Sequence, residues 1–143
     1  MILFLVNFLM GATALCTAQL DQERTMTLSI DGKFLKVGAM NPDAKLVKCE
    51  QNSKFPKLYL AEIFMGISGT SRLASRTNLV IVDTSGKSLK KVLEKTIHRS
   101  IEMLDEETGE NIKEDEPHTY SITADKKGRP QLQLDQEKPI LLK

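Results

Sequence analysis

Ser68, Asp83 and two histidines carry the functional groups that hydrolytic chemistry would need. Ser68 stands in Gly66-Ile67-Ser68-Gly69-Thr70, which has threonine where a nucleophile elbow needs its last glycine. His98 or His118 would serve as the base, but a triad is defined by geometry and requires these side chains to converge in one pocket. A small hydrolase is therefore the third of three functional hypotheses.

A second motif, Gly86-Lys87-Ser88, copies the last three positions of a phosphate-binding loop and lies between a predicted strand and a predicted helix. The complete loop also needs a glycine five residues before Gly86, where this chain has Ile81. Without that glycine the backbone cannot curl around a nucleotide phosphate. The motif therefore predicts a tight turn, at which a simple anion could still dock on free amides.

Residues 105–110 and 114–116 form an acidic cluster whose carboxylates would suit calcium. A calcium loop that starts at Asp105 departs from the known pattern at its third and fifth positions, Glu107 and Gly109. Two distant histidines and a lone cysteine do not match the ligand spacing of a zinc site. We therefore expect no metal site and no cofactor.

Composition argues against nucleic acid as a partner. The formal net charge is only +1, the chain has no tryptophan, and aromatic residues make up 5%. Such a chain offers neither a strong positive field nor stacking platforms for bases. The partner we expect is another protein or a component of the cell envelope.

The residues that would recognise such a partner lie in a segment with helical periodicity, residues 88–108. Apolar side chains recur there at 3.6-residue spacing, and Gly109 stands where a helix C-cap glycine belongs. The polar side is basic at its start and acidic at its end, the reverse of what a helix dipole favours. We take the cations of this segment, together with Lys87 just before it, as the candidate binding face: Lys87, Lys90, Lys91, Lys95 and Arg99.

The remaining elements are short and extended. Residues 25–30 and 34–37 flank Asp31-Gly32, which predicts a hairpin, and residues 45–50 predict a further strand. Residues 79–82 are apolar on both faces and predict a central strand that is covered twice. A second hairpin is expected over residues 119–134, and a last edge strand over residues 139–142.

Three other segments complete the pattern. Residues 57–67 fit a strand or a helix, whereas residues 67–78 and 111–117 have the composition of loops. The order of strands, long helix and strands predicts an α+β fold, in which a small, mostly antiparallel sheet carries one long amphipathic helix.

Residues 1–18 carry no charged side chain and end in small residues. This predicts a signal peptide cleaved after Ala18 or Ala14, followed by a single domain over residues 19–143. The expected basic start is missing, so a retained anchor over residues 2–20 and a buried core helix remain alternatives. Loss of residues 1–18 would leave Cys49 without a disulfide partner, as a small buried side chain.

Together these features favour an exported, non-enzymatic binding module that is secreted or periplasmic. The second hypothesis is a membrane-anchored subunit of a complex, with residues 2–20 as the span. The two hypotheses differ in whether the N-terminal residues are cleaved off or retained in the mature protein.

Overall fold

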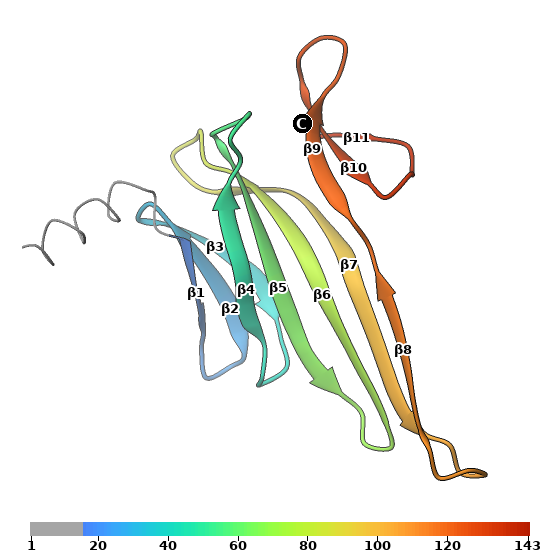
Figure 1. The fold of residues 1–143 in the computed structure, drawn as a ribbon. Coiled ribbons are helices and arrows are strands. Elements are labelled where there is room, and N and C mark those ends of the chain that lie inside the picture. The colour runs from blue at the N-terminus through green and yellow to red at the C-terminus, as the bar shows by residue number, and fades with distance from the viewer. Residues whose placement is uncertain (1–15) are drawn as a thin grey trace, which may run out of the picture.

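The computed structural model describes residues 16–143, and the only regular secondary structure among them is β-strand. The expectation of an α+β fold with a long helix is therefore wrong: this part of the chain is all-β, arranged as three antiparallel sheets (Figure 1). The strands are β1 (Cys16–Leu20), β2 (Thr25–Ile30), β3 (Lys33–Ala39), β4 (Lys45–Gln51), β5 (Leu58–Ser68), β6 (Arg72–Asp83), β7 (Lys90–Leu104), β8 (Asn111–Pro117), β9 (Tyr120–Ala124), β10 (Pro130–Leu134) and β11 (Ile140–Leu141).

The largest sheet has the order β4-β5-β6-β7-β8, and its central strands are buried on both faces. The side chains of residues 79–82 in β6 are 0% exposed, which confirms the predicted central strand. Alternate residues point to opposite faces of a strand. Val80 and Val82 accordingly lie in one apolar core, and Leu79 and Ile81 lie in another.

Each core is closed by one of the small sheets. The sheet β1-β2-β3 packs on one face through Met26, Leu28 and Ile30 of β2. The sheet β11-β10-β9 packs on the other face through Leu132 and Leu134 of β10. The lower ends of β5 to β8 extend beyond both small sheets (Figure 1), so neither small sheet covers that part of the large sheet.

The predicted hairpins are confirmed. Asp31 and Gly32 join β2 to β3 with φ values of 56° and 78°, as a turn with two left-handed central residues requires. β9 pairs with β10 in the second hairpin, and the predicted last strand is the edge strand β11. Local turn chemistry was sufficient to specify these pairs.

The predicted helix is instead the 15-residue strand β7. Its pairing with β6 shifts register twice, so that Val92 and Ile97 are extra residues between paired positions. Such bulges place consecutive residues on one face and interrupt the alternation of a strand. Gly109, with φ of 72°, belongs to the turn between β7 and β8 rather than to a helix cap.

The two segments predicted as loops are also strands. Residues 72–78 belong to β6, and residues 111–117 form the edge strand β8, which is exposed along its whole length. Its acidic side chains explain the error, because charged edge strands resemble loops in composition and resist pairing with other chains. The ambiguous residues 57–67 belong largely to strand β5.

Cys49 is not free, contrary to expectation, because it forms a disulfide with Cys16, 33 positions away. The bond ties the start of β1 to the edge strand β4. Cleavage of a leader after Ala18 would remove Cys16, whereas cleavage after Ala14 would leave it in the chain. Residues 1–15, which hold most of the predicted leader, lie outside the described residues. Within residues 16–143 no helix has the length and apolarity to span a membrane.

Replacing both cysteines by serine should lower the free energy of unfolding by about 3–4 kcal/mol, because the disulfide closes a long loop in the unfolded chain. Urea unfolding of the wild type and of Cys16→Ser/Cys49→Ser measures this loss. Reduction of the wild type with dithiothreitol should give a similar loss, and the double variant should not respond to it. A wild type insensitive to reduction would contradict the pairing.

Candidate functional site: a groove lined by two arginines

Two arginines face each other across the central strands. The register of β6 and β7 places Arg76 directly opposite Arg99, and directly opposed residues project from the same face of a sheet. Like charges in this position destabilise a sheet. Among residues 16–143, no carboxylate lies within 4.0 Å of either guanidinium. On its other side Arg99 stands opposite Glu116 of β8, but no ion pair within 4.0 Å joins the two side chains. The guanidinium groups therefore remain able to bind an anion through paired N–H donors.

The two arginines line a groove of about 530 Å³ at the point where β6 and β7 leave the cover of the small sheet. The chain just after β3 forms one wall, through Met40 and Asn41. Met65, Ala74 and Ile101 add apolar surface from the large sheet. Apolar lining with a few convergent polar groups, in a volume of this size, is typical of small-molecule sites.

Close backbone packing holds this wall in place. The Asn41 amide donates to the Met65 carbonyl at 3.3 Å, and the Ile67 amide donates to the Asp43 carboxylate at 3.1 Å. Between them, Gly66 adopts a φ of 94° at a bulge of β5. A β-carbon on Gly66 would lie 2.4 Å from the β-carbon of Asn41. Only glycine allows the wall to approach the sheet this closely.

The candidate binding residues do not form one face. Lys87 lies in the turn between β6 and β7, and the other four lie along β7. Lys91 stands opposite Val82, on the face of one core, whereas Lys95 stands opposite Leu79, on the face of the other. Of the five, only Arg99 lines the groove.

Sequence reasoning missed Arg76, the second arginine of the groove. It lies in the segment that was predicted as a loop, among serines and threonines. No local pattern distinguishes it from its neighbours, because its importance arises from pairing with a strand that follows later in the chain. Only the register between β6 and β7 identifies it.

The residues of the hydrolase hypothesis are not brought together. Ser68 pairs with Ala74 at one end of the large sheet, and Asp83 pairs with Leu58 at the other end. Neither histidine approaches Ser68: His98 lies 3.4 Å from a carboxylate oxygen of Asp115, and His118 contacts Asp135. Within residues 16–143, Ser68 therefore has neither histidine beside it as a base.

A second hollow, of about 600 Å³, lies on the opposite face of the large sheet. There the Tyr120 hydroxyl donates to the Glu62 carboxylate at 2.5 Å, across from β9 to β5. Burial, together with this hydrogen bond, raises the pKa of Tyr120. The hydroxyl therefore remains a protonated donor that ties the small sheet to the large one.

Metal ligands do not gather at either hollow. No group of three or more His, Cys, Asp or Glu side chains is placed to hold an ion within residues 16–143. In the acidic turn between β7 and β8, the Asp105 carboxylate accepts a hydrogen bond from the Glu107 amide at 2.9 Å and so stabilises the turn.

Comparison with known proteins finds no matching family model, no similar curated protein and no similar solved structure. Function is therefore inferred from the geometry of the groove.

Gly66→Ala should lower the free energy of unfolding by about 2–4 kcal/mol, because it adds a steric clash to an unfavourable left-handed backbone. Gly128→Ala is the matched control: its φ is 78°, but a β-carbon there would meet nothing within 4 Å. Thermal or urea unfolding of both variants compares the two costs. Equal losses would show that Gly66 does not pack against Asn41.

The contact between His118 and Asp135 should make stability depend on pH. The hydrogen bond to Asp135 raises the pKa of His118 above 6.5, and hydrogen bonds from the Thr119 amide and from His118 lower the pKa of Asp135 below 3.8. The histidine contribution is complete below pH 6.5 and is lost as the pH rises through the raised pKa. The aspartate contribution is complete above pH 3.8 and is lost as the pH falls through the lowered pKa.

The pair therefore stabilises the fold fully between pH 3.8 and 6.5. NMR titration of the imidazole should give a midpoint above 6.5 in the wild type and a lower one in Asp135→Asn. Asp115→Asn, near the other histidine, should leave the titration of His118 unchanged. A wild-type midpoint that does not respond to Asp135→Asn would contradict the assignment.

Proposed function

We propose that this chain is an exported, non-enzymatic binding module, and that its groove binds an apolar ligand that carries a carboxylate, such as a long-chain fatty acid. The observation that carries the proposal is the pair Arg76–Arg99, which forms no ion pair among residues 16–143 and lies beside an apolar lining. A sheet tolerates such repulsion where an anionic ligand relieves it.

Both halves of the groove match this ligand. A guanidinium fork recognises a planar carboxylate through two parallel hydrogen bonds, and two arginines can share one head group. Met40 and Met65 offer flexible, polarisable contacts that adapt to an unbranched chain.

The disulfide supports export, since such bonds persist in oxidising compartments and are rare in reducing ones. It agrees with a secreted or periplasmic location. The alternative, a membrane-anchored subunit with residues 2–20 as its span, predicts the same domain on the outer side of a membrane. Intact mass of the protein from its own host, with fractionation, separates a shortened soluble species from a full-length membrane species.

The test of the groove is a calorimetric titration with oleate, at concentrations below those at which oleate forms micelles. Replacing one arginine, as Arg76→Gln or Arg99→Gln, should weaken binding about tenfold to a hundredfold, because each removes a charged hydrogen bond. Lys95→Gln is the matched control, since it removes one positive charge from the other face of β7. Oleyl alcohol, which lacks the carboxylate, should bind much more weakly.

Stability provides an independent readout. Arg76→Gln should raise the free energy of unfolding of the free protein by about 0.2–1 kcal/mol, because it removes repulsion between opposed cations. A purely structural role would instead lower it. Equal binding of oleate and oleyl alcohol, or a loss with Lys95→Gln as large as with Arg99→Gln, would overturn the proposal.

A further inference from the structure

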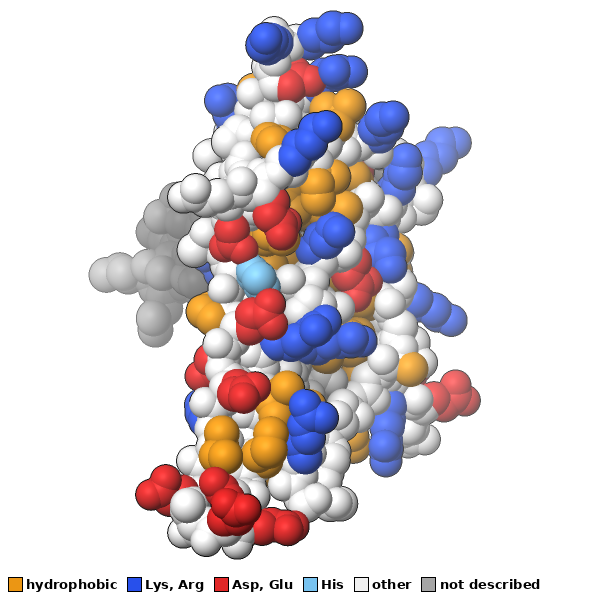
Figure 2. Space-filling model, turned by 90° about the vertical axis from the view of Figure 1, so that its right-hand side faces the viewer, with side chains coloured by type: hydrophobic (Ala, Val, Ile, Leu, Met, Phe, Trp, Pro, Cys, Tyr) orange, Lys and Arg blue, Asp and Glu red, His pale blue; other side chains and the backbone are white. Residues whose placement is uncertain are grey.

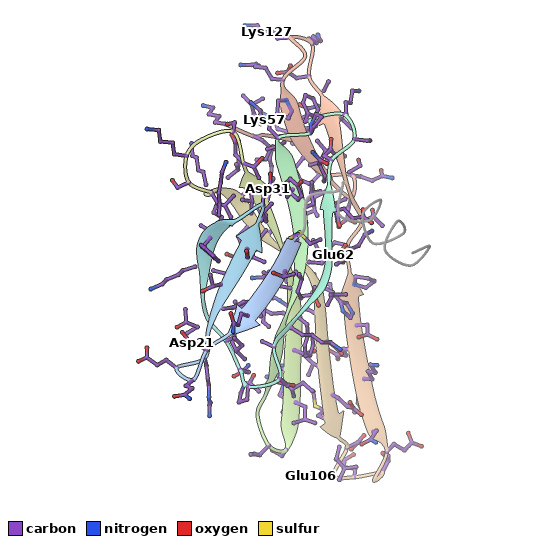
Figure 3. The ribbon with its side chains drawn as sticks, turned by 90° about the vertical axis from the view of Figure 1, so that its left-hand side faces the viewer. Asp21, Asp31, Lys57, Glu62, Glu106 and Lys127 are labelled. Atoms are coloured by element: carbon purple, nitrogen blue, oxygen red, sulfur yellow. A yellow bond between two sulfur atoms is a disulfide. The ribbon has the colours of Figure 1, made fainter. Side chains whose placement is uncertain are left out.

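Positive charge gathers at one end of the domain, remote from the groove's apolar wall. Figure 2 shows lysines and arginines concentrated at the upper end of the molecule and acidic side chains at the lower end. Figure 3 places Lys57 and Lys127 toward the upper end and Glu106 at the lower tip. Charge is therefore unevenly distributed on this face although the formal net charge of the chain is only +1.

Hydrogen bonds hold three connections together at this end. The Lys33 ammonium donates to the carbonyls of Thr84 and Gly86, at 2.9 and 2.7 Å. The Thr84 amide and hydroxyl both donate to the Lys57 carbonyl at 2.9 Å. These contacts hold the connections β2–β3, β4–β5 and β6–β7 together. We term the lysines in and next to these connections the basic end: Lys33, Lys36, Lys57, Lys87, Lys90 and Lys91.

Few acids neutralise the basic end. Asp31 lies in the turn between β2 and β3, and Asp83 accepts the Ser85 amide and hydroxyl at 2.8 and 2.7 Å. Glu94 lies further along β7 and pairs with Lys91 at 3.1 Å. Lys36, Lys87 and Lys90 are exposed and form no ion pair within residues 16–143.

An exposed aromatic side chain stands among these lysines. Phe34 is 68% exposed, more than any other large hydrophobic side chain of residues 16–143. It directly follows Lys33, and Lys36 lies two positions further along the same face of β3. Aromatic and basic side chains together are typical of surfaces that contact the interface of a lipid bilayer.

The entry point of the chain lies at the same end. Cys16 pairs with Ile30 across β1 and β2, and Ile30 pairs with Lys33 across β2 and β3. Whatever precedes Cys16 therefore joins the domain beside the basic end. Those preceding residues are uncharged and begin with the apolar run of residues 2–10.

From these three observations we infer that the basic end docks on a membrane surface rich in anionic lipid headgroups, with Phe34 inserted at the interface. The lysines supply attraction to the headgroups, and the aromatic ring adds apolar contact. The docked membrane would then lie next to Cys16, where the preceding residues join the domain. This inference does not depend on the ligand of the arginine groove, which opens elsewhere on the large sheet.

The test is partitioning of the full chain onto phosphatidylcholine vesicles and onto vesicles that also contain phosphatidylserine. The difference in binding between the two kinds of vesicle gives the contribution of lipid charge, because residues 1–15 carry no charged side chain. The wild type should prefer the anionic vesicles, and salt should weaken that preference. Lys36→Gln/Lys87→Gln/Lys90→Gln should reduce it about a hundredfold, since each surface lysine contributes about fivefold.

Two controls match these changes. Lys45→Gln/Lys48→Gln/Lys113→Gln removes the same charge from β4 and β8 and should leave the preference unchanged. Phe34→Ala should weaken binding to both vesicles, whereas Leu104→Ala, at a side chain 58% exposed near the acidic end, should not. Thermal unfolding of each variant confirms that it is folded.

A wild type without preference for anionic vesicles, or with a preference that salt does not reduce, would overturn the inference. So would equal losses in the two triple variants. Binding of polyphosphate or heparin without binding of anionic vesicles would show that a soluble polyanion is the partner, and would overturn it as well.

Discussion

Burial of β5 and β6 on both faces is the constraint on which the rest of the structure depends. A strand that is apolar on both sides cannot remain at the surface of a two-layer protein, because one row of its side chains would stay in water. Leu58 and Leu60 of β5 face one core, and Tyr59, Ala61 and Ile63 face the other. Two separate small sheets are therefore needed, one for each face.

The functional surfaces arise where this constraint ends. The small sheets cover only part of the long strands, and beyond them β6 and β7 carry polar and charged residues on a half-open face. Arg76 and Arg99 stand opposite one another in that part of the sheet. At the other end, Lys33 at the start of β3 donates hydrogen bonds to the turn between β6 and β7, and the exposed lysines of the basic end lie in and next to these connections. The covered middle of the sheet provides stability, and its uncovered ends are free to bind.

The segment of residues 88–108 shows why periodicity alone was misleading. The two bulges in β7 lie five positions apart, so the apolar side chains Val92, Leu93 and Ile97 recur with a spacing close to that of a helix. The segment is also rich in β-branched residues, which favour strands. The segment forms a strand because β6 needs a hydrogen-bonded neighbour on each edge, and β7 is one of the two. An isolated peptide has no such neighbour, so its own pattern cannot reveal the strand.

Local chemistry by itself determined the turn at Asp31-Gly32, the hairpin of β9 and β10 and the buried strand around Val80, because each depends on residues close together in the chain. Of the candidate site, it identified Arg99 among five cations. Only the tertiary structure decided the all-β fold, the disulfide between Cys16 and Cys49 and the opposition of Arg76 to Arg99. These features join residues far apart in the chain, and such pairings are selected by the burial of whole sheets rather than by any short pattern.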